Sequence, residues 1–338
     1  MSAVATDAFI EALPKLELHI HLEGSIPLSR IQAEAEEHGI APPRPYDTLF
    51  VTEDLTEFLE TLDWICNLFQ SPEQLERLAH DFAVYCRDQG MLYCEVIVNP
   101  THWGNFDLDT LLPTLSDAFE AASDICDIRI LPSILRTQSG EEALTLVNWI
   151  GEAHARGLAP RVIGLSVDGN EQVSGPTGER FAPAYQRAAE LGLGLTSHAG
   201  ESSGAEGVQD ALDWLKVDRL DHGVRAIENP ALVLRLAAEG VTLNVCVSSN
   251  CVRLYSGPDT HPFPALLEAG VPVTVNTDDP VVLNTTLIDE LKWLVEHYQL
   301  TPRQLLALQR TAVNATFCGE QDKAALHEAL DQAEAALA

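Results

Sequence analysis

The sequence predicts an α/β fold, a (β/α)8 barrel, from two observations. Short stretches rich in apolar and β-branched residues alternate with longer amphipathic stretches, which is typical of parallel strands joined by helices. Eight strand-like stretches follow one another, and eight such units favour closure of the sheet into a barrel. A chain of 338 residues fits one barrel, so residues 1–338 are expected to form a single domain.

Helices are expected between most of the eight strands. The strands are predicted at 16–22, 91–98, 127–134, 161–168, 193–198, 218–223, 241–248 and 272–278. The helices are predicted at 73–88, 108–124, 140–156, 180–191, 205–215, 230–239 and 263–269. The interval from 24 to 90 is too long for one helix and is expected to hold extra helices, including 55–69. The tail beyond residue 300 is also predicted to be helical, with Thr301-Pro302 as its start.

The composition excludes several classes of partner. The formal net charge is −31, and only four of the twenty basic residues are lysines. Nucleic acids and anionic membrane surfaces attract positive charge, so neither is an expected partner. No apolar run approaches the roughly 20 residues that span a bilayer. The seven cysteines are scattered without a C-x-x-C pair, and no signal-like N-terminus is seen, which predicts a cytoplasmic protein. The oligomeric state is left open.

The pair His19 and His21 is the most informative local feature. It lies in the segment 16–22, where apolar and polar residues alternate as in a β-strand. Residues two apart on a strand share a face, so both imidazoles point the same way. Two neighbouring imidazoles are costly to bury unless a partner binds them, and a divalent metal is the usual partner.

Three further predicted strands also end in ionisable side chains. His198 and Glu201 follow the strand at 193–198, His222 lies in the strand at 218–223, and Asp278 and Asp279 follow the strand at 272–278. Barrel active sites gather at the carboxyl ends of the strands. These side chains are therefore expected around the same cavity as the histidine pair.

Three imidazoles and a carboxylate from this set suit a catalytic zinc ion that keeps one position open for water. Such a metal lowers the pKa of its water from 15.7 to about 7, which supplies a nucleophile at neutral pH. Glu201, His222 and Asp279 then remain. A hydrolase of this type needs three further groups, namely a proton donor, a group that orients or deprotonates the water, and a substrate anchor, and the number of remaining residues fits. Each motif alone has an ordinary interpretation, such as a core histidine or a turn before Pro280. Their joint placement favours the metal site.

Seven histidines lie outside this set, mostly in predicted helices or loops without acidic partners at ligand spacing. They are expected to be surface or packing residues: His38, His80, His102, His154, His261, His297 and His327. For His102 and Trp103, after the second strand, two interpretations stay open. They line the mouth of the pocket or make an ordinary loop contact.

Four motifs together resemble the adenosine deaminase family. They are Leu-His-Ile-His-Leu-Glu-Gly at 18–24, Ser-His-Ala-Gly-Glu at 197–201, Asp-His-Gly at 221–223 and Asn-Thr-Asp-Asp-Pro at 276–280. They occur in the family's order and span residues 18 to 280. The family is a metal-dependent (β/α)8 barrel of the amidohydrolase superfamily, so the resemblance implies this fold and the hydrolytic deamination of a 6-aminopurine.

The resemblance also implies roles for the site residues. Glu201 would donate a proton to purine N1, His222 would orient the water, and Asp279 would bind purine N7. The stretch 167–171 is similar to the family's glycine loop, so the backbone N–H of Gly169 would meet purine N3. The resemblance further implies a catalytic set completed by one Zn²⁺ per chain, which four ligands would hold: His19, His21, His198 and Asp278.

The identity of the substrate is less closely specified. Glu23 stands where adenosine deaminases usually carry Asp near the ribose, and Glu at this position is more similar to adenine and aminodeoxyfutalosine deaminases. The leading prediction is adenosine or a substituted adenosine, converted to the inosine-type 6-oxopurine and ammonia. Adenine and aminodeoxyfutalosine are the alternatives within the family.

Two other classes of function are less favoured. A metal-dependent amide or phosphoester hydrolase with two metals usually carries a bridging lysine at the end of its fourth strand, and 161–168 has none. A catalytically inactive binding protein would have lost a ligand or the proton donor, and all of these are present.

The predicted helix at 55–69 carries one apolar face. Phe58, Leu62 and Ile65 lie at i, i+4 and i+7. Either this face closes over the substrate and sets the size of the tolerated substituent at C9, or it packs against the rim of the barrel.

Overall fold

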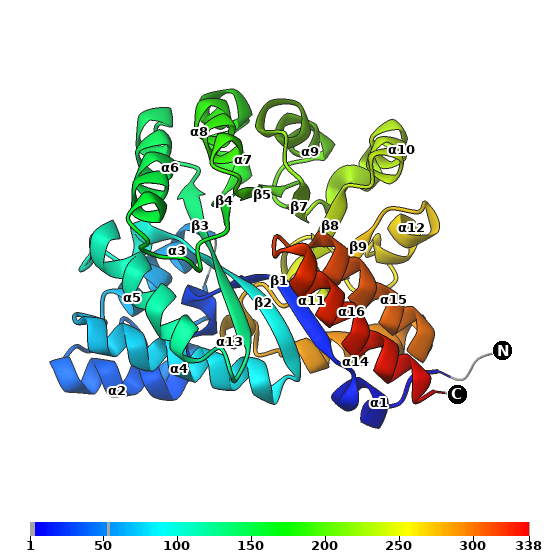
Figure 1. The fold of residues 1–338 in the computed structure, drawn as a ribbon, viewed down its shortest axis with the longest axis horizontal. Helices are drawn as coiled ribbons and strands as arrows, with labels where there is room; N and C mark the ends of the chain where they lie inside the picture. Colours follow the sequence, from blue (N-terminus) through cyan, green and yellow to red (C-terminus); the bar gives the residue numbers. More distant parts are fainter. Residues whose placement is uncertain (1–3, 53–54, 338) are drawn as a thin grey trace.

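Parallel strands surround the centre of the molecule, and helices surround the strands (Figure 1). The computed structural model describes residues 4–52 and 55–337. The strands are Lys15–His21 (β1), Met91–Val98 (β2), Asp127–Leu135 (β3), Gly164–Asp168 (β4), Gly194–Leu195 (β5), His198–Ala199 (β6), Arg219–His222 (β7), Thr242–Val245 (β8) and Val273–Val275 (β9). Strands β1 to β5 pair in parallel in chain order, and so do strands β6 to β9.

Hydrogen bonds at two places make these strands one closed barrel. β5 and β6 are two pieces of a single fifth strand, because Thr196 N donates to Leu165 O on one side (3.0 Å) and Asp221 N donates to Ser197 O on the other (2.9 Å). The ring closes where Asp278, just beyond β9, bridges Ile20 of β1. The predicted eight-stranded barrel is confirmed.

Helices pack around the outside of the barrel (Figure 1). α4 lies against β2 and α5, α6 lies against α8, and α15 covers β1 and β9 where the ring closes. The outer helices are Pro72–Asp88 (α4), Leu108–Ala121 (α5), Gly140–Ala155 (α6), Gly178–Glu190 (α8), Ala205–Asp210 (α9) with its π-helical continuation Ala211–Leu215, Pro230–Glu239 (α10), Phe263–Glu268 (α12) and Pro302–Ala315 (α15).

Further helices precede β1, lie between β1 and β2, and follow β9 in the chain. The longer ones are Asp7–Ala12 (α1), Leu28–His38 (α2), Leu55–Cys66 (α3), Leu287–Tyr298 (α14) and Glu320–Ala335 (α16). Short helical segments follow most strands: Glu23–Ser25, Pro100–His102, Glu171–Ser174 (α7), Val224–Glu228, Val247–Arg253 (α11) and Pro280–Leu283 (α13). Another, Tyr46–Thr48, lies between α2 and α3. The predicted extra helices before β2 and in the tail are therefore present.

Local sequence signals explain where several helices begin. Ser71, Ser139 and Thr301 each cap a helix whose third residue, Gln or Glu, bonds back to the cap. The predicted helix start at Thr301-Pro302 is one of these. None of the helices in the described ranges combines the length and apolar character needed to cross a membrane.

Some predicted boundaries are wrong. The strand predicted at 241–248 ends at Val245, and α11 begins at Val247. Cys246 and Val247 are fully buried, but Cys246 lies in a turn and Val247 in a helix, not in a strand. A short apolar run is compatible with a buried strand and with a buried helix, so its periodicity could not distinguish the two. The strand predicted from 161 begins at Gly164, and α14 was not predicted.

Candidate active site and metal centre

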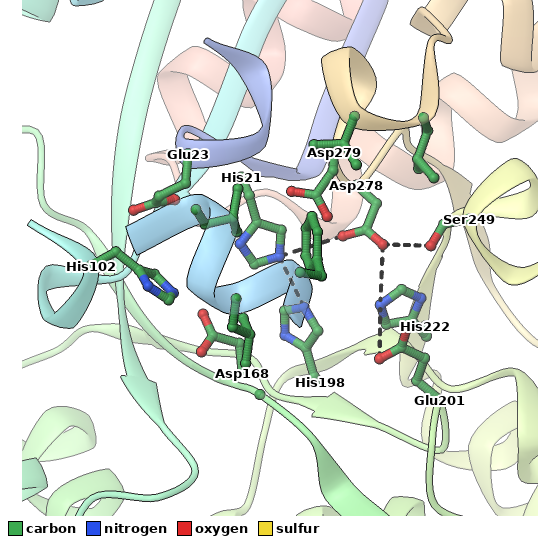
Figure 2. Close-up of a pocket in the computed structure, with 16 residues that line it drawn as sticks. His21, Glu23, His102, Asp168, His198, Glu201, His222, Ser249, Asp278 and Asp279 are labelled. Atoms are coloured by element: carbon green, nitrogen blue, oxygen red, sulfur yellow. Dashed lines mark hydrogen bonds and ion pairs between the residues drawn. The ribbon is translucent and has the colours of Figure 1, made fainter. Parts of the chain in front are cut away.

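A cavity lies at the carboxyl ends of the barrel strands (Figure 2). It brings together segments from β1, β4, β6, β7 and the end of β9, as the sequence predicted. The predicted site residues that line it are His21, Glu23, Gly169, His198, Glu201, His222, Asp278 and Asp279. His19 is fully buried beside them. The structure therefore gathers all of the predicted site residues in one place.

Four imidazoles form the centre of this site. The ring centroid of His19 lies 4.6 Å from those of His198 and His222 and 5.5 Å from that of His21. His21 Nε2 is 3.0 Å from His198 Nε2. Burial lowers the pKa of both His21 and His198, so each ring is neutral and has a lone pair. Two lone pairs this close are stabilised by a cation between them, which suits a metal site.

Asp278 supplies a carboxylate to the same centre. Its Oδ1 lies 3.2 Å from His19 Nε2 and 3.5 Å from His21 Nε2. Its Oδ2 accepts a hydrogen bond from Ser249 Oγ at 2.7 Å. Burial opposes ionisation, but the contact with His19 and the neighbouring imidazoles hold the pKa of Asp278 well below its usual range. Asp278 therefore offers an ionised oxygen to a metal.

Distances alone admit two sets of metal ligands. Ligand atoms of His19, His198, His222 and Asp278 all lie within 4.8 Å of one another. The predicted set has His21 in place of His222, and His21 Nε2 lies within hydrogen-bond or ion-pair distance of both His198 and Asp278. The donor set is imidazole and carboxylate in either case, the chemistry of a metal site that keeps a position for water.

Asp221 is a site residue whose role sequence reasoning missed. Its carboxylate is fully buried, 3.4 Å from His19 Nδ1 and 3.7 Å from His198 Nδ1. Adjacent strand residues normally face opposite sides, so the sequence suggested only His222. His222 has φ 62°, in the left-handed region, and this turn brings both neighbours to the cluster. A carboxylate behind metal-binding imidazoles orients the rings.

The backbone around Glu201 is held by another buried carboxylate, that of Glu171 in α7. Glu171 accepts hydrogen bonds from the backbone N–H groups of Gly200 (3.1 Å), Glu201 (2.9 Å) and Ser203 (3.1 Å), and from Ser203 Oγ (2.6 Å). Burial opposes ionisation, but Arg136 and these donors hold the pKa of Glu171 below its ordinary value. The Glu201 side chain itself reaches to 3.9 Å from His222 Nε2.

Arg136 links this support to the metal centre. Its guanidinium lies 3.9 Å from Glu171, and it donates to the carbonyl oxygen of His198 and to Thr177 Oγ1. The segment from His198 to Glu201 is thus fixed at both ends. Arg136 lies in none of the motifs, and Glu171 lies in the stretch 167–171 but received no role of its own, because the partners of both residues are mostly backbone atoms far away in the sequence.

One wall of the cavity is formed by Glu23. Its Oε1 accepts hydrogen bonds from Trp103 Nε1 (2.7 Å) and from the backbone N–H of Asn99 (2.9 Å). Its Oε2 is buried and has no hydrogen-bond partner among the residues described. Burial raises the pKa of this carboxyl. Next to it, a Cβ on Gly24 would lie 1.8 Å from Asp279 Oδ1, so only glycine fits there.

Apolar side chains form another part of the cavity wall. Phe58, Leu59 and Leu62 of α3 line it together with Val282 and Leu283 of α13. Ile65, the third residue of the predicted apolar face, is fully buried and does not line the cavity.

Of the two residues with an open interpretation, His102 lines the cavity and Trp103 is fully buried behind it. His102 also ties α3 to the barrel, because its Nδ1 lies 2.6 Å from Asp63 Oδ1.

Comparisons with known proteins agree with this geometry. The family model for adenosine deaminase matches residues 14–333. The adenine deaminase of Mesorhizobium japonicum is 36% identical over 324 residues, which cover 92% of this chain and 96% of that protein.

Solved structures are similar over the whole barrel. An adenine deaminase from Arthrobacter aurescens has a TM-score of 0.87 at 28% identity, covering 95% of this chain and 98% of that one. An amidohydrolase from Burkholderia ambifaria with bound zinc has a TM-score of 0.87 at 26% identity, covering 100% and 98%. The chain therefore belongs to the adenosine deaminase family and is a hydrolytic deaminase.

Proposed function

We propose that this protein converts a 6-aminopurine to the 6-oxopurine and ammonia at a site that holds one zinc ion, with free adenine as its preferred substrate. The observation that carries the proposal is the convergence of four imidazoles, the Asp278 carboxylate and Glu201 on one cavity. His19, His21, His198 and Asp278 would hold the zinc. When bound in such a site, zinc lowers the pKa of a water molecule to about 7 and so supplies the nucleophile.

The remaining polar groups assist the addition of water to C6. Glu201 gives its proton to N1, so the ring does not accumulate a negative charge when C6 becomes tetrahedral. His222 orients the attacking oxygen through a hydrogen bond. The proton of the hydroxyl group added at C6 then passes to the amino group, the C6–N bond breaks, ammonia leaves, and C6 keeps the oxygen as the 6-oxo group. The other proton of the water replaces the one that Glu201 gave to N1. Asp279 and the backbone N–H of Gly169 hold purine N7 and N3, which fixes the ring against the nucleophile.

The wall of the cavity supports adenine over adenosine. Glu23 Oε2 is a buried acceptor without a hydrogen-bond partner in the described part of the chain, and such a group favours a ligand that donates to it. Free adenine has an imidazole-ring N–H, which a nucleoside lacks because N9 carries the sugar. The relatives named adenine deaminase are consistent with this choice. The sequence predicted adenosine, so adenosine is the substrate with which adenine is compared in the assays.

Changing Glu201→Gln tests the proton donor. The amide cannot donate a carboxylic proton, so turnover of adenine should fall by about 10²- to 10⁴-fold while zinc is retained. Steady-state absorbance assays and elemental analysis measure the two quantities. Glu206→Gln, an exposed carboxylate in the first turn of α9 just after this loop, is the matched control. Near-wild-type turnover in Glu201→Gln would remove Glu201 from this role.

The adjacent carboxylates Asp278 and Asp279 separate metal binding from substrate binding. Asp278→Ala should release zinc, because it removes a ligand whose oxygen lies within 3.5 Å of two imidazoles. Asp279→Ala should retain zinc and weaken substrate binding. Zinc content after dialysis against a weak chelator is the measurement. Full zinc occupancy in Asp278→Ala would exclude this residue as a ligand.

Phe58→Ala tests whether α3 limits the substituent at C9. Removing the ring from the cavity wall should raise the ratio of kcat/KM for adenosine to that for adenine by about tenfold. Ile65→Ala is the control, since Ile65 is buried in the same helix without lining the cavity. An unchanged ratio in Phe58→Ala, or an equal rise in both variants, would assign this face to packing alone.

Glu171→Gln tests the support of the Glu201 loop. In the variant, an amide nitrogen replaces a carboxylate oxygen that accepts hydrogen bonds from backbone N–H groups. Because this nitrogen cannot accept them, the loop should shift. We expect kcat to fall by about 10- to 100-fold with zinc retained. Exposed Glu179 on the neighbouring α8 provides the control variant Glu179→Gln. If kcat of Glu171→Gln equals that of the wild type, the loop does not depend on this carboxylate.

A further inference from the structure

A buried row of hydrogen bonds leads away from the cavity behind His222. Asn250 Nδ2 lies 3.1 Å from His222 Nδ1, and Asn250 Oδ1 lies 3.3 Å from His261 Nε2. The backbone N–H of Phe263 donates to His261 Nδ1 at 3.1 Å. The side chains of His222, Asn250 and His261 are all buried. Asn250 belongs to α11, and His261 lies just before α12.

The hydrogen bond between Phe263 N–H and His261 Nδ1 fixes the direction of the other two hydrogen bonds in the row. A backbone N–H can only donate, so His261 Nδ1 accepts, and the proton of neutral His261 is on Nε2. This Nε2–H donates to Asn250 Oδ1, which turns the amide nitrogen of Asn250 toward His222. The amide then donates to His222 Nδ1. The proton of neutral His222 is therefore on Nε2, the nitrogen that faces the cavity.

The opposite orientation of the hydrogen bonds is incompatible with the bond from Phe263 N–H to His261. If the Asn250 amide were turned around, its nitrogen would donate to His261 Nε2, and the His261 proton would move to Nδ1. That proton would face the N–H of Phe263 across 3.1 Å. A doubly protonated His261 would meet the same clash. Burial also lowers the pKa of His261 to about 4, so this ring is neutral near pH 7.

His222 and His198 consequently present opposite groups to the cavity. His198 Nδ1 lies 3.0 Å from the carbonyl oxygen of Val167, which can only accept, so His198 Nε2 has a free lone pair. His222 Nε2 instead has a proton. It lies 3.8 Å from Asp278 Oδ2 and 3.9 Å from Glu201 Oε2, and within the described residues it makes no hydrogen bond. It has a hydrogen to donate and no lone pair for a metal.

We propose that Asn250 and His261 are positioning residues that hold His222 in its Nε2–H tautomer, so that His222 donates a hydrogen bond into the cavity and does not ligate the metal. This selects His19, His21, His198 and Asp278 from the two ligand sets that the distances admit. The acceptor of the His222 hydrogen bond, the attacking oxygen, rests on the proposed function. The position of the proton rests on the fold alone.

The test reads the tautomer directly. Zinc-loaded protein labelled with ¹⁵N-histidine is recorded in a long-range ¹H–¹⁵N correlation spectrum, which distinguishes a protonated ring nitrogen from an unprotonated one. A His222→Gln variant assigns the His222 signals by their loss. We expect a protonated Nε2 and an unprotonated Nδ1. A protonated Nδ1, or a His222 Nε2 signal shifted by zinc, would overturn the proposal.

Asn250→Asp reverses the hydrogen bond between residue 250 and His222 with almost no change of shape. A carboxylate accepts from both rings, so the His222 proton should move to Nδ1. We expect kcat for adenine to fall by about 10- to 100-fold, with KM and zinc content little changed. Val252→Asp places the same charge on an exposed position of α11 and is the control. An unchanged His222 tautomer in Asn250→Asp would contradict the proposal.

His261→Asn provides an independent variant if Asn250→Asp does not fold. Its side-chain oxygen can still accept from Phe263 N–H, but the donor to Asn250 is lost, so a second His222 tautomer should appear. A single, unchanged tautomer would again contradict the proposal. The proposed function fails separately: wild-type protein that is inactive on both adenine and adenosine would exclude that function without altering the spectrum.

Discussion

The pairing of Asp278 with β1 is the constraint on which the site depends. Asp278 N donates to His19 O (3.2 Å) and His21 N donates to Asp278 O (2.8 Å). These two backbone bonds close the barrel and place the carboxylate between the imidazoles of the first strand. Asp278 has φ 69°, a conformation that non-glycine residues seldom adopt. The barrel therefore closes through a residue of the site itself.

Polar side chains reinforce this closure where regular strand pairing ends. Asn276 Oδ1 accepts from the backbone N–H groups of Leu18 (2.9 Å) and His19 (3.2 Å). Glu17 Oε1 accepts from Thr277 N (2.6 Å) and Thr277 Oγ1 (2.7 Å). Buried backbone N–H groups without partners are costly, so these side chains stabilise the end of β9 against β1. The same residues hold the histidine pair and the aspartate in register.

Buried polar groups behind the cavity wall orient the groups that face the cavity. Asp221 lies behind His19 and His198, Ser249 bonds Asp278, Glu171 holds the Glu201 loop and Asn250 bonds His222. Backbone N–H groups, which can only donate, hold two of these positions: they bond to Glu171, and the N–H of Phe263 bonds to His261, the neighbour of Asn250. A fixed role at one end of a hydrogen-bond row determines the orientation of every group along it.

The order of strands and helices was readable from the sequence because it depends on local periodicity. Errors occurred where periodicity is ambiguous, as at Cys246 and Val247, or where an element was left unassigned, as for α14. The site residues that face the cavity could also be predicted, since each lies in a short motif at a strand end. His261 was expected only as a surface or packing residue, although it ends a hydrogen-bond row that reaches the site.

By itself, the sequence determined the barrel, the groups around its cavity and the family, because strand periodicity and the strand-end motifs are properties of short stretches. Only the tertiary structure decided which groups support the site. Glu171, Asp221 and Asn250 act on residues or backbone atoms that reach them through the closed barrel, and Phe263 fixes a proton on His222 from 41 residues away in the chain. Such roles depend on distances and donor directions between remote segments, which no local pattern contains.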